Sequence, residues 1–157
     1  MLLIVELSLP RGKQFNNIIC DIEHRVFKNP NKYIEELSPP VYFLLKDNKY
    51  RKLIWDKAIV KGILQLVITI SELGYKFDPN NEILIASKEG HKELVNFFIG
   101  KGANCWDRAM IFATQGGHKD LVEFFVEKGA NNWNDRINYA ARAGYTDIVD
   151  FFTEKTI

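Results

Sequence analysis

Residues 89–104, 116–131 and 143–157 read EGHKELVNFFIGKGAN, GGHKDLVEFFVEKGAN and AGYTDIVDFFTEKTI. The three stretches align at a spacing of 27 residues, and a weaker copy precedes them between Ala58 and Gly74 at a spacing of 28. A fixed period of this length is typical of proteins built from stacked structural repeats. The sequence therefore predicts about four copies of one structural unit.

Each unit is expected to form two short helices. In the third unit, Met110 to Ala113 form an apolar stripe that stops at Gly116-Gly117, where glycine can take the positive φ of a helix C-terminus. Leu121 to Val126 then recur at helical spacing until Gly129 ends the second run. One such pair cannot bury its apolar face alone, so neighbouring pairs are expected to stack on a shared core.

The segment GHKDLVEFFVEKGAN resembles the second helix of the ankyrin repeat, and Ala113 and Ala140 stand where that family has alanines before its Gly-His. The resemblance covers residues 58–157. It implies an all-α, ankyrin-like helix-turn-helix solenoid. It also implies that His91 and His118 make hydrogen bonds between repeats.

Two departures from the family pattern stand out. The family's unit has about 33 residues, so the 27-residue period implies that the projecting β-hairpin tip is missing. The T-P-L-H opening of the first helix is replaced by residues 108–111 (RAMI) and 135–138 (DRIN). Short units rich in Phe and Asn resemble the ankyrin-like repeats of large DNA viruses.

The expected organisation is a small N-terminal capping module, residues 1–50, followed by repeats at 51–80, 81–107, 108–134 and 135–157. The module lacks the Gly-His landmark, and its simplest role is to cover the exposed face of the first repeat. The alternative is a second interaction motif, because Leu9-Pro10, Phe15 and Ile18-Ile19 faintly resemble the start of an F-box.

Charge and composition narrow the functional classes. Residues 1–56 carry 9 basic and 7 acidic side chains and residues 57–157 carry 12 and 13, so no basic segment indicates nucleic-acid binding. No apolar stretch is long enough to span a bilayer, and no signal peptide is apparent. The two cysteines fit a reducing compartment. We expect a soluble, intracellular and cytoplasmic protein, in the host cytoplasm if it is viral.

Side chains that could support chemistry are few. Cys20 and His24 could share one helix face, and His91, Cys105 and His118 add possible metal ligands, but the spacing matches no known zinc site. We therefore expect no enzyme, no cofactor, no catalytic residue and no metal site. A small metal-dependent enzyme built on the N-terminal module is the weakest alternative.

The candidate partner-binding residues come from loops and helix ends. Trp106 and Trp133 stand 27 apart in the short loops, where each either packs under the neighbouring loop or anchors a partner. The ankyrin resemblance adds positions that face the concave side in that family, whose alternative is an ordinary solvated surface: Lys88, Glu89, Lys101, Asp107, Gln115, Lys128, Asn134 and Arg142.

The function expected from these features is non-enzymatic protein–protein interaction, as an adaptor whose partner is another protein. For a viral protein, that partner would be a host protein. The alternative is a structural or assembly protein that associates with itself. Neither nucleic acid nor membrane is an expected partner, and we expect a monomer or weak self-association.

Overall fold

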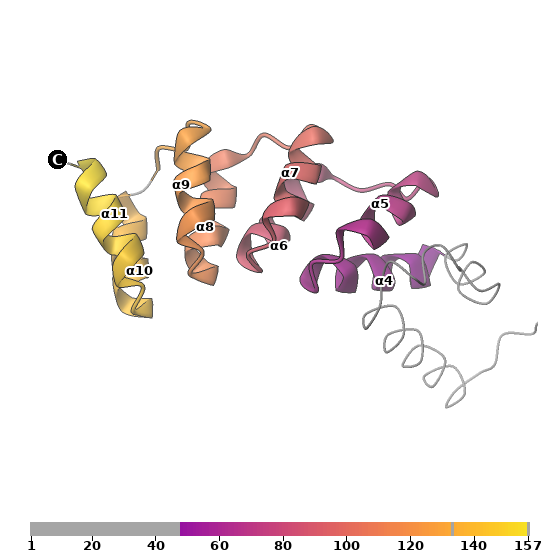
Figure 1. The fold of residues 1–157 in the computed structure, drawn as a ribbon, viewed down its shortest axis with the longest axis horizontal. Helices are drawn as coiled ribbons and strands as arrows, with labels where there is room; N and C mark the ends of the chain where they lie inside the picture. Colours follow the sequence, from indigo (N-terminus) through magenta and orange to yellow (C-terminus); the bar gives the residue numbers. More distant parts are fainter. Residues whose placement is uncertain (1–47, 133, 157) are drawn as a thin grey trace, which may run out of the picture.

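The computed structural model describes residues 48–132 and 134–156, and within these ranges it is all-helical, with no strand (Figure 1). The expected all-α solenoid is confirmed. The predicted capping module lies outside the described residues except for residues 48–50, which begin the first described helix. The eight described helices form four pairs: α4 (Asn48–Val60) and α5 (Leu64–Glu72), α6 (Pro79–Lys88) and α7 (Lys92–Gly100), α8 (Trp106–Gly116) and α9 (Lys119–Glu127), α10 (Asn134–Ala143) and α11 (Thr146–Thr156).

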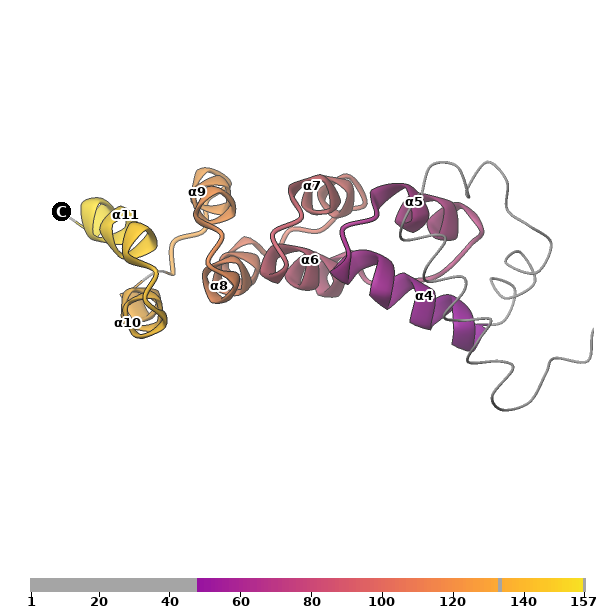
Figure 2. The same cartoon turned by 60° about the horizontal axis from the view of Figure 1, so that its bottom comes forward.

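The pairs stack in chain order and make two layers. We call α4, α6, α8 and α10 the helices A, and α5, α7, α9 and α11 the helices B. Figure 2 shows the helices A in one row and the helices B in a second row. Successive helices A contact each other more extensively than successive helices B. The helices A are thus the more closely packed layer. Each helix A begins slightly before the predicted boundary of its repeat unit, so the exact division into units stays a prediction.

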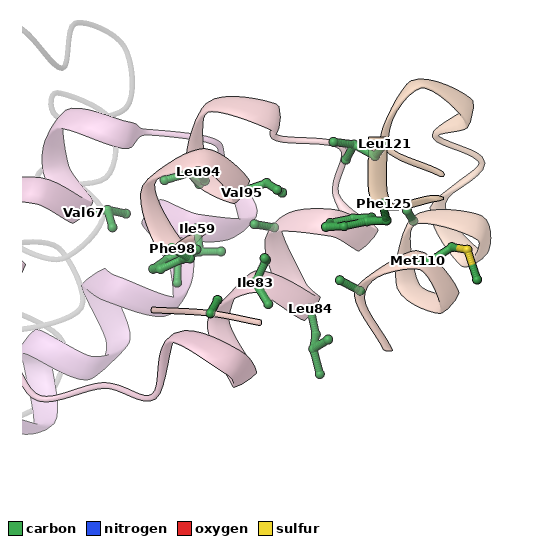
Figure 3. Packing of buried hydrophobic residues seen from close by; sticks show 14 of the residues in the cluster. Ile59, Val67, Ile83, Leu84, Leu94, Val95, Phe98, Met110, Leu121 and Phe125 are labelled. Carbon is green, nitrogen blue, oxygen red and sulfur yellow. The ribbon is translucent and has the colours of Figure 1, made fainter. Parts of the chain in front are cut away.

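The core repeats with the sequence period. Phe98, Phe125 and Phe152 are fully buried, and so are Ala86 and Ala113 on the helices A. Alanine at these positions lets helices approach closely, while each buried Phe contributes about 2 kcal/mol through removal of apolar area from water. Figure 3 shows Phe98 and Phe125 pointing into the space between neighbouring helices. The core is therefore continuous across the repeat junctions rather than confined to each pair.

A tight turn joins each helix A to its helix B. After α6, Gly90 has φ +78° and its N–H donates to Ser87 O over 3.3 Å, while His91 N donates to Ala86 O over 2.9 Å. This pair of bonds satisfies carbonyls at the helix end that would otherwise lack partners. The corresponding bond to the alanine carbonyl recurs at Ala58, Ala113 and Ala140.

The loops between pairs are short and are held by side chains instead of a hairpin. The Asn80 side-chain oxygen accepts a hydrogen bond from Asn104 N over 2.9 Å. Twenty-seven residues on, Asp107 Oδ1 accepts bonds from Asn131 N at 2.9 Å and Asn132 N at 3.1 Å. On α6 and α8, an Asn or Asp in the first turn thus binds the backbone of the loop that follows its own helix pair. These bonds satisfy loop amides that a longer repeat could pair within a hairpin.

Candidate functional site

One side-chain contact crosses each repeat junction. His91 Nε2 lies 3.0 Å from Val60 O, and His118 Nε2 lies 2.9 Å from Lys88 O. A carbonyl oxygen only accepts, so each Nε2 carries the proton and donates it. Tyr145 holds the same repeat position, and its hydroxyl donates to Gln115 O over 3.4 Å. The geometry agrees with the inter-repeat role expected for the histidines and extends it to the tyrosine.

The contact of His118 with the preceding repeat also explains why glycine stands at position 90. The His118 ring lies against the turn of the preceding pair, where a Cβ on Gly90 would stand 2.6 Å from His118 Nδ1. Gly144 has a similar φ of +80°, but nothing lies within 4 Å of its Cβ position. Gly90 is therefore required both for its positive φ and for the approach of the ring, whereas Gly144 is required only for its φ.

Metal chemistry finds no support in the described ranges. Residues 48–132 and 134–156 contain no group of three or more His, Cys, Asp or Glu side chains that could hold a metal ion. Cys105 is half-buried, burial raises the pKa of its thiol, and its Sγ donates to Asn80 O over 3.4 Å. The predicted donors Cys20 and His24 lie outside the described residues.

The candidate binding residues fall at two opposite ends of the helix pairs, because each helix A is followed by a tight turn and an antiparallel helix B (Figure 1). Lys88, Glu89, Gln115 and Arg142 lie at the carboxyl ends of the helices A, beside the A-to-B turns. The structure does not describe Trp133 or the side chain of Asn134. The other four candidates lie at the opposite end of the helix pairs, beside the loops that join one pair to the next. We call this the loop end, and its candidates are Lys101, Trp106, Asp107 and Lys128.

The loop-end residues make contacts within the chain. The half-buried Trp106 ring stacks on Phe125 with 6.4 Å between ring centroids and 23° between planes. Trp106 was expected either to pack within the chain or to anchor a partner, and this geometry favours packing. The Lys101 ammonium lies 5.3 Å from the Phe97 ring centroid, and that of Lys128 lies 5.5 Å from the Phe124 centroid. With Asp107 bonded to the next loop, these residues fasten the loop end of the solenoid.

The helices A present a more open surface along one stripe. On α4, α6 and α8, three positions with the spacing i, i+4 and i+7 share this side, as expected for helical geometry, and the structure describes the side chains of the last two on α10. We call this set the helix-A stripe: Leu53, Lys57 and Val60 on α4; Asn81, Ile85 and Lys88 on α6; Arg108, Phe112 and Gln115 on α8; Tyr139 and Arg142 on α10.

Large apolar side chains are exposed on this stripe. Among the described residues four large hydrophobic side chains are exposed, and three of them belong to the stripe: Leu53 (40%), Val60 (45%) and Tyr139 (42%). Sequence reasoning placed only Lys88, Gln115 and Arg142 here. The sequence did contain a signal for this surface, because one repeat position of the helices A is apolar in three of four units. Its residues are Lys57, Ile85, Phe112 and Tyr139. At this position Ile85 and Phe112 are half-buried against the core and Tyr139 is exposed, so part of each apolar side chain faces solvent and indicates a contact surface.

A half-buried carboxyl group, that of Glu82, at the first described junction was also missed. Trp55 is fully buried beside Tyr75 and Phe77, with ring centroids 5.0 and 4.6 Å away. Neither Trp55 Nε1 nor Glu82 Oε2 has a partner with hydrogen-bond geometry. Burial raises the pKa of the Glu82 carboxyl. The nearby indole N–H acts in the opposite sense and is outweighed.

Some charged neighbours of Glu82 raise the pKa of its carboxyl group and others lower it. Asp56 on α4 and Asp78 before α6 raise its pKa further, whereas Lys52 on α4 lowers it. Glu82 occupies the repeat position of Ala109, which is fully buried. The α4–α6 junction thus holds an acidic group where a neighbouring junction is apolar.

These features define an α-helical repeat protein whose extended surface is formed by successive helix pairs. Residues 83–157 match the family model described as ankyrin repeats in three copies. No curated protein and no solved structure matches the chain. Ankyrin repeats are generally protein–protein interaction modules. None of the described helices is long and apolar enough to cross a membrane.

The junction contact predicts different costs for the same substitution at two glycines. Gly90→Ala and Gly144→Ala both place a side chain at positive φ, which costs about 1 to 2 kcal/mol. Only Gly90→Ala also collides with His118, so it should lower the unfolding free energy more than Gly144→Ala, as measured by urea denaturation.

A double-mutant cycle isolates the steric part. His118→Ala alone should cost about 1 kcal/mol or more through its lost hydrogen bond. In the His118→Ala background, Gly90→Ala should cost no more than Gly144→Ala does. Equal costs for the two glycines in the wild-type background would contradict the junction geometry.

The half-buried carboxyl group of Glu82 predicts a pH effect on stability. Because the pKa of Glu82 is raised above its ordinary value of 4.5, its contribution to stability is fully present below that pH and is lost as pH rises through the folded-state pKa. Glu82→Gln should therefore raise the melting temperature at pH 7 and leave it nearly unchanged at pH 4. Glu93→Gln, an equal charge change on the exposed face of α7, should not raise it. A lower melting temperature for Glu82→Gln at pH 7 would show that the carboxylate is well solvated.

Proposed function

We propose that the chain is a non-enzymatic protein-binding adaptor that recognises its partner through the helix-A stripe. The supporting observation is the exposure of Leu53 and Val60 on α4 and of Tyr139 on α10, at positions of the helix-A stripe. A row of stacked helices offers a long, open surface rather than a closed pocket, which suits a protein partner better than a small molecule.

Within this proposal the ten candidate residues divide into two roles. Lys88, Gln115 and Arg142 contact the partner directly, and Glu89 flanks them at the end of α6. The loop-end residues Lys101, Trp106, Asp107 and Lys128 fix the loops and so keep successive helices A in register. Trp133 and Asn134 stand 27 residues after Trp106 and Asp107 in the sequence, and the same role is proposed for them.

The proposed setting is intracellular and cytoplasmic. The short units, rich in Phe and Asn, resemble the ankyrin-like repeats of large DNA viruses, which makes a host protein the candidate partner. Affinity capture with chemical crosslinking from the source cells, followed by mass spectrometry, would identify the partner used in the binding measurements below.

Binding and stability should separate cleanly between the two groups of residues. The Lys88→Ala/Arg142→Ala double variant removes two exposed charges and should weaken partner binding several-fold, because exposed ion pairs contribute about 0.2 to 1 kcal/mol each. Its melting temperature should stay near that of the wild type. Lys92→Ala/Lys155→Ala, on the helices B, is the matched control and should bind normally.

Trp106→Ala should behave in the opposite way. Loss of the stacked ring on Phe125 should cost about 1 to 3 kcal/mol of stability, while the folded variant keeps its affinity. Calorimetric titration and thermal melts of all three variants test this division. Unchanged affinity in the Lys88→Ala/Arg142→Ala variant together with weakened binding in the helix-B control would move the proposed surface to the other face.

A further inference from the structure

The two helix layers carry opposite charge. The side chains that the structure describes on the helices A include seven basic and three acidic residues, whereas those on the helices B include three basic and eight acidic residues. The basic residues of the helices A are Arg51, Lys52, Lys57, Lys88, Arg108, Arg136 and Arg142. The acidic residues of the helices B are Glu72, Glu93, Asp120, Glu123, Glu127, Asp147, Asp150 and Glu154. The net charge of +1 for the whole chain conceals this separation.

Three of the cations on the helices A are available at the stripe. Lys88, Arg108 and Arg142 are exposed and make no ion pair with any residue in the described ranges. They come from three successive helices, α6, α8 and α10. Each is thus placed beside an apolar residue of the same stripe, at a spacing of three or four positions: Ile85, Phe112 and Tyr139.

We propose that the helix-A stripe binds an acidic amphipathic segment of a protein partner, an inference that rests on the proposed function. Apolar side chains of that segment contact Phe112 and Tyr139, and its carboxylates meet Lys88, Arg108 and Arg142. The apolar contacts supply most of the affinity. The positive layer raises the association rate and disfavours basic partners.

The pattern of the stripe argues against nucleic acid as the occupant. Phosphate binding needs a line of cations that follows the backbone. Here the exposed Tyr139 and the solvent-facing parts of the half-buried Ile85 and Phe112 stand beside the three cations and offer apolar surface to a partner's side chains. An acidic segment with spaced apolar residues matches both components of the stripe.

A displayed random peptide library, selected on the full-length wild-type chain, tests the inference without knowledge of the natural partner. We expect the selected peptides to be enriched in Asp and Glu interleaved with aromatic or aliphatic residues. Their affinity should fall as salt concentration rises, because exposed charges are screened.

Two pairs of variants locate the binding. Lys88→Glu/Arg108→Glu/Arg142→Glu should weaken the selected peptides about tenfold or more, while Lys92→Glu/Lys119→Glu/Lys155→Glu changes the charge equally on the helices B and should have little effect. Tyr139→Ser should weaken binding, whereas Leu73→Ser should not. Leu73 is similarly exposed at 37% but lies outside the stripe. Circular dichroism confirms that each variant is folded.

The outcomes separate this inference from the proposed function. Selected peptides without acidic enrichment, whose binding still depends on Tyr139, would overturn the acidic partner and leave protein binding by the stripe intact. Peptides whose binding is insensitive to every stripe variant would overturn both. Concentration-dependent self-association of the wild type, abolished by the charge reversal on the helices A, would assign the stripe to a contact between copies and overturn the inference.

Discussion

A hydrogen bond from a ring to a backbone carbonyl joins each repeat to the one before it, and the rest of the solenoid depends on it. His91, His118 and Tyr145 each reach the end of the preceding helix A. The ring can approach only because the turn that it faces has no Cβ at Gly62, Gly90 or Gly117. This contact fixes the separation of successive helices A at one end, where the buried alanines allow close packing. That spacing places the stripe positions of α6 and α8 on closely packed neighbouring helices.

The loop end of the solenoid uses different chemistry for the same purpose. Asn80 and Asp107 bind loop amides, and lysine ammonium groups lie over the rings of the half-buried Phe97 and Phe124. Between these fastened ends the helices A still differ in their side chains. Glu82 in the first turn of α6 is half-buried where α8 has the buried Ala109, and exposed apolar residues of the stripe stand on α4 and α10.

The helix pairs were predictable because each repeat touches only its neighbours, so a one-dimensional period encodes them. The role of the junction histidines was predictable from the resemblance to ankyrin repeats. The division of the candidate binding residues between two ends of the helix pairs was not predictable in this way. Lys88 and Lys101 were placed in one set, although the antiparallel pairing puts them at opposite ends. The charge layers were also missed, since counts along the chain mix the two kinds of helix. Trp106 left two alternatives open in the sequence, and only its stacking on Phe125 favours one.

Deletion of one whole period, Arg108 to Asn134, tests the central claim that the repeats are equivalent, stacked units. The shortened chain would bring Tyr145 to the place of His118, against Gly90 and Lys88 O. Far-UV circular dichroism with thermal melting should show a helical protein that unfolds cooperatively at a lower temperature than the wild type, because nearest-neighbour stacking is kept. A deletion variant without helical signal would contradict the equivalence of the repeats.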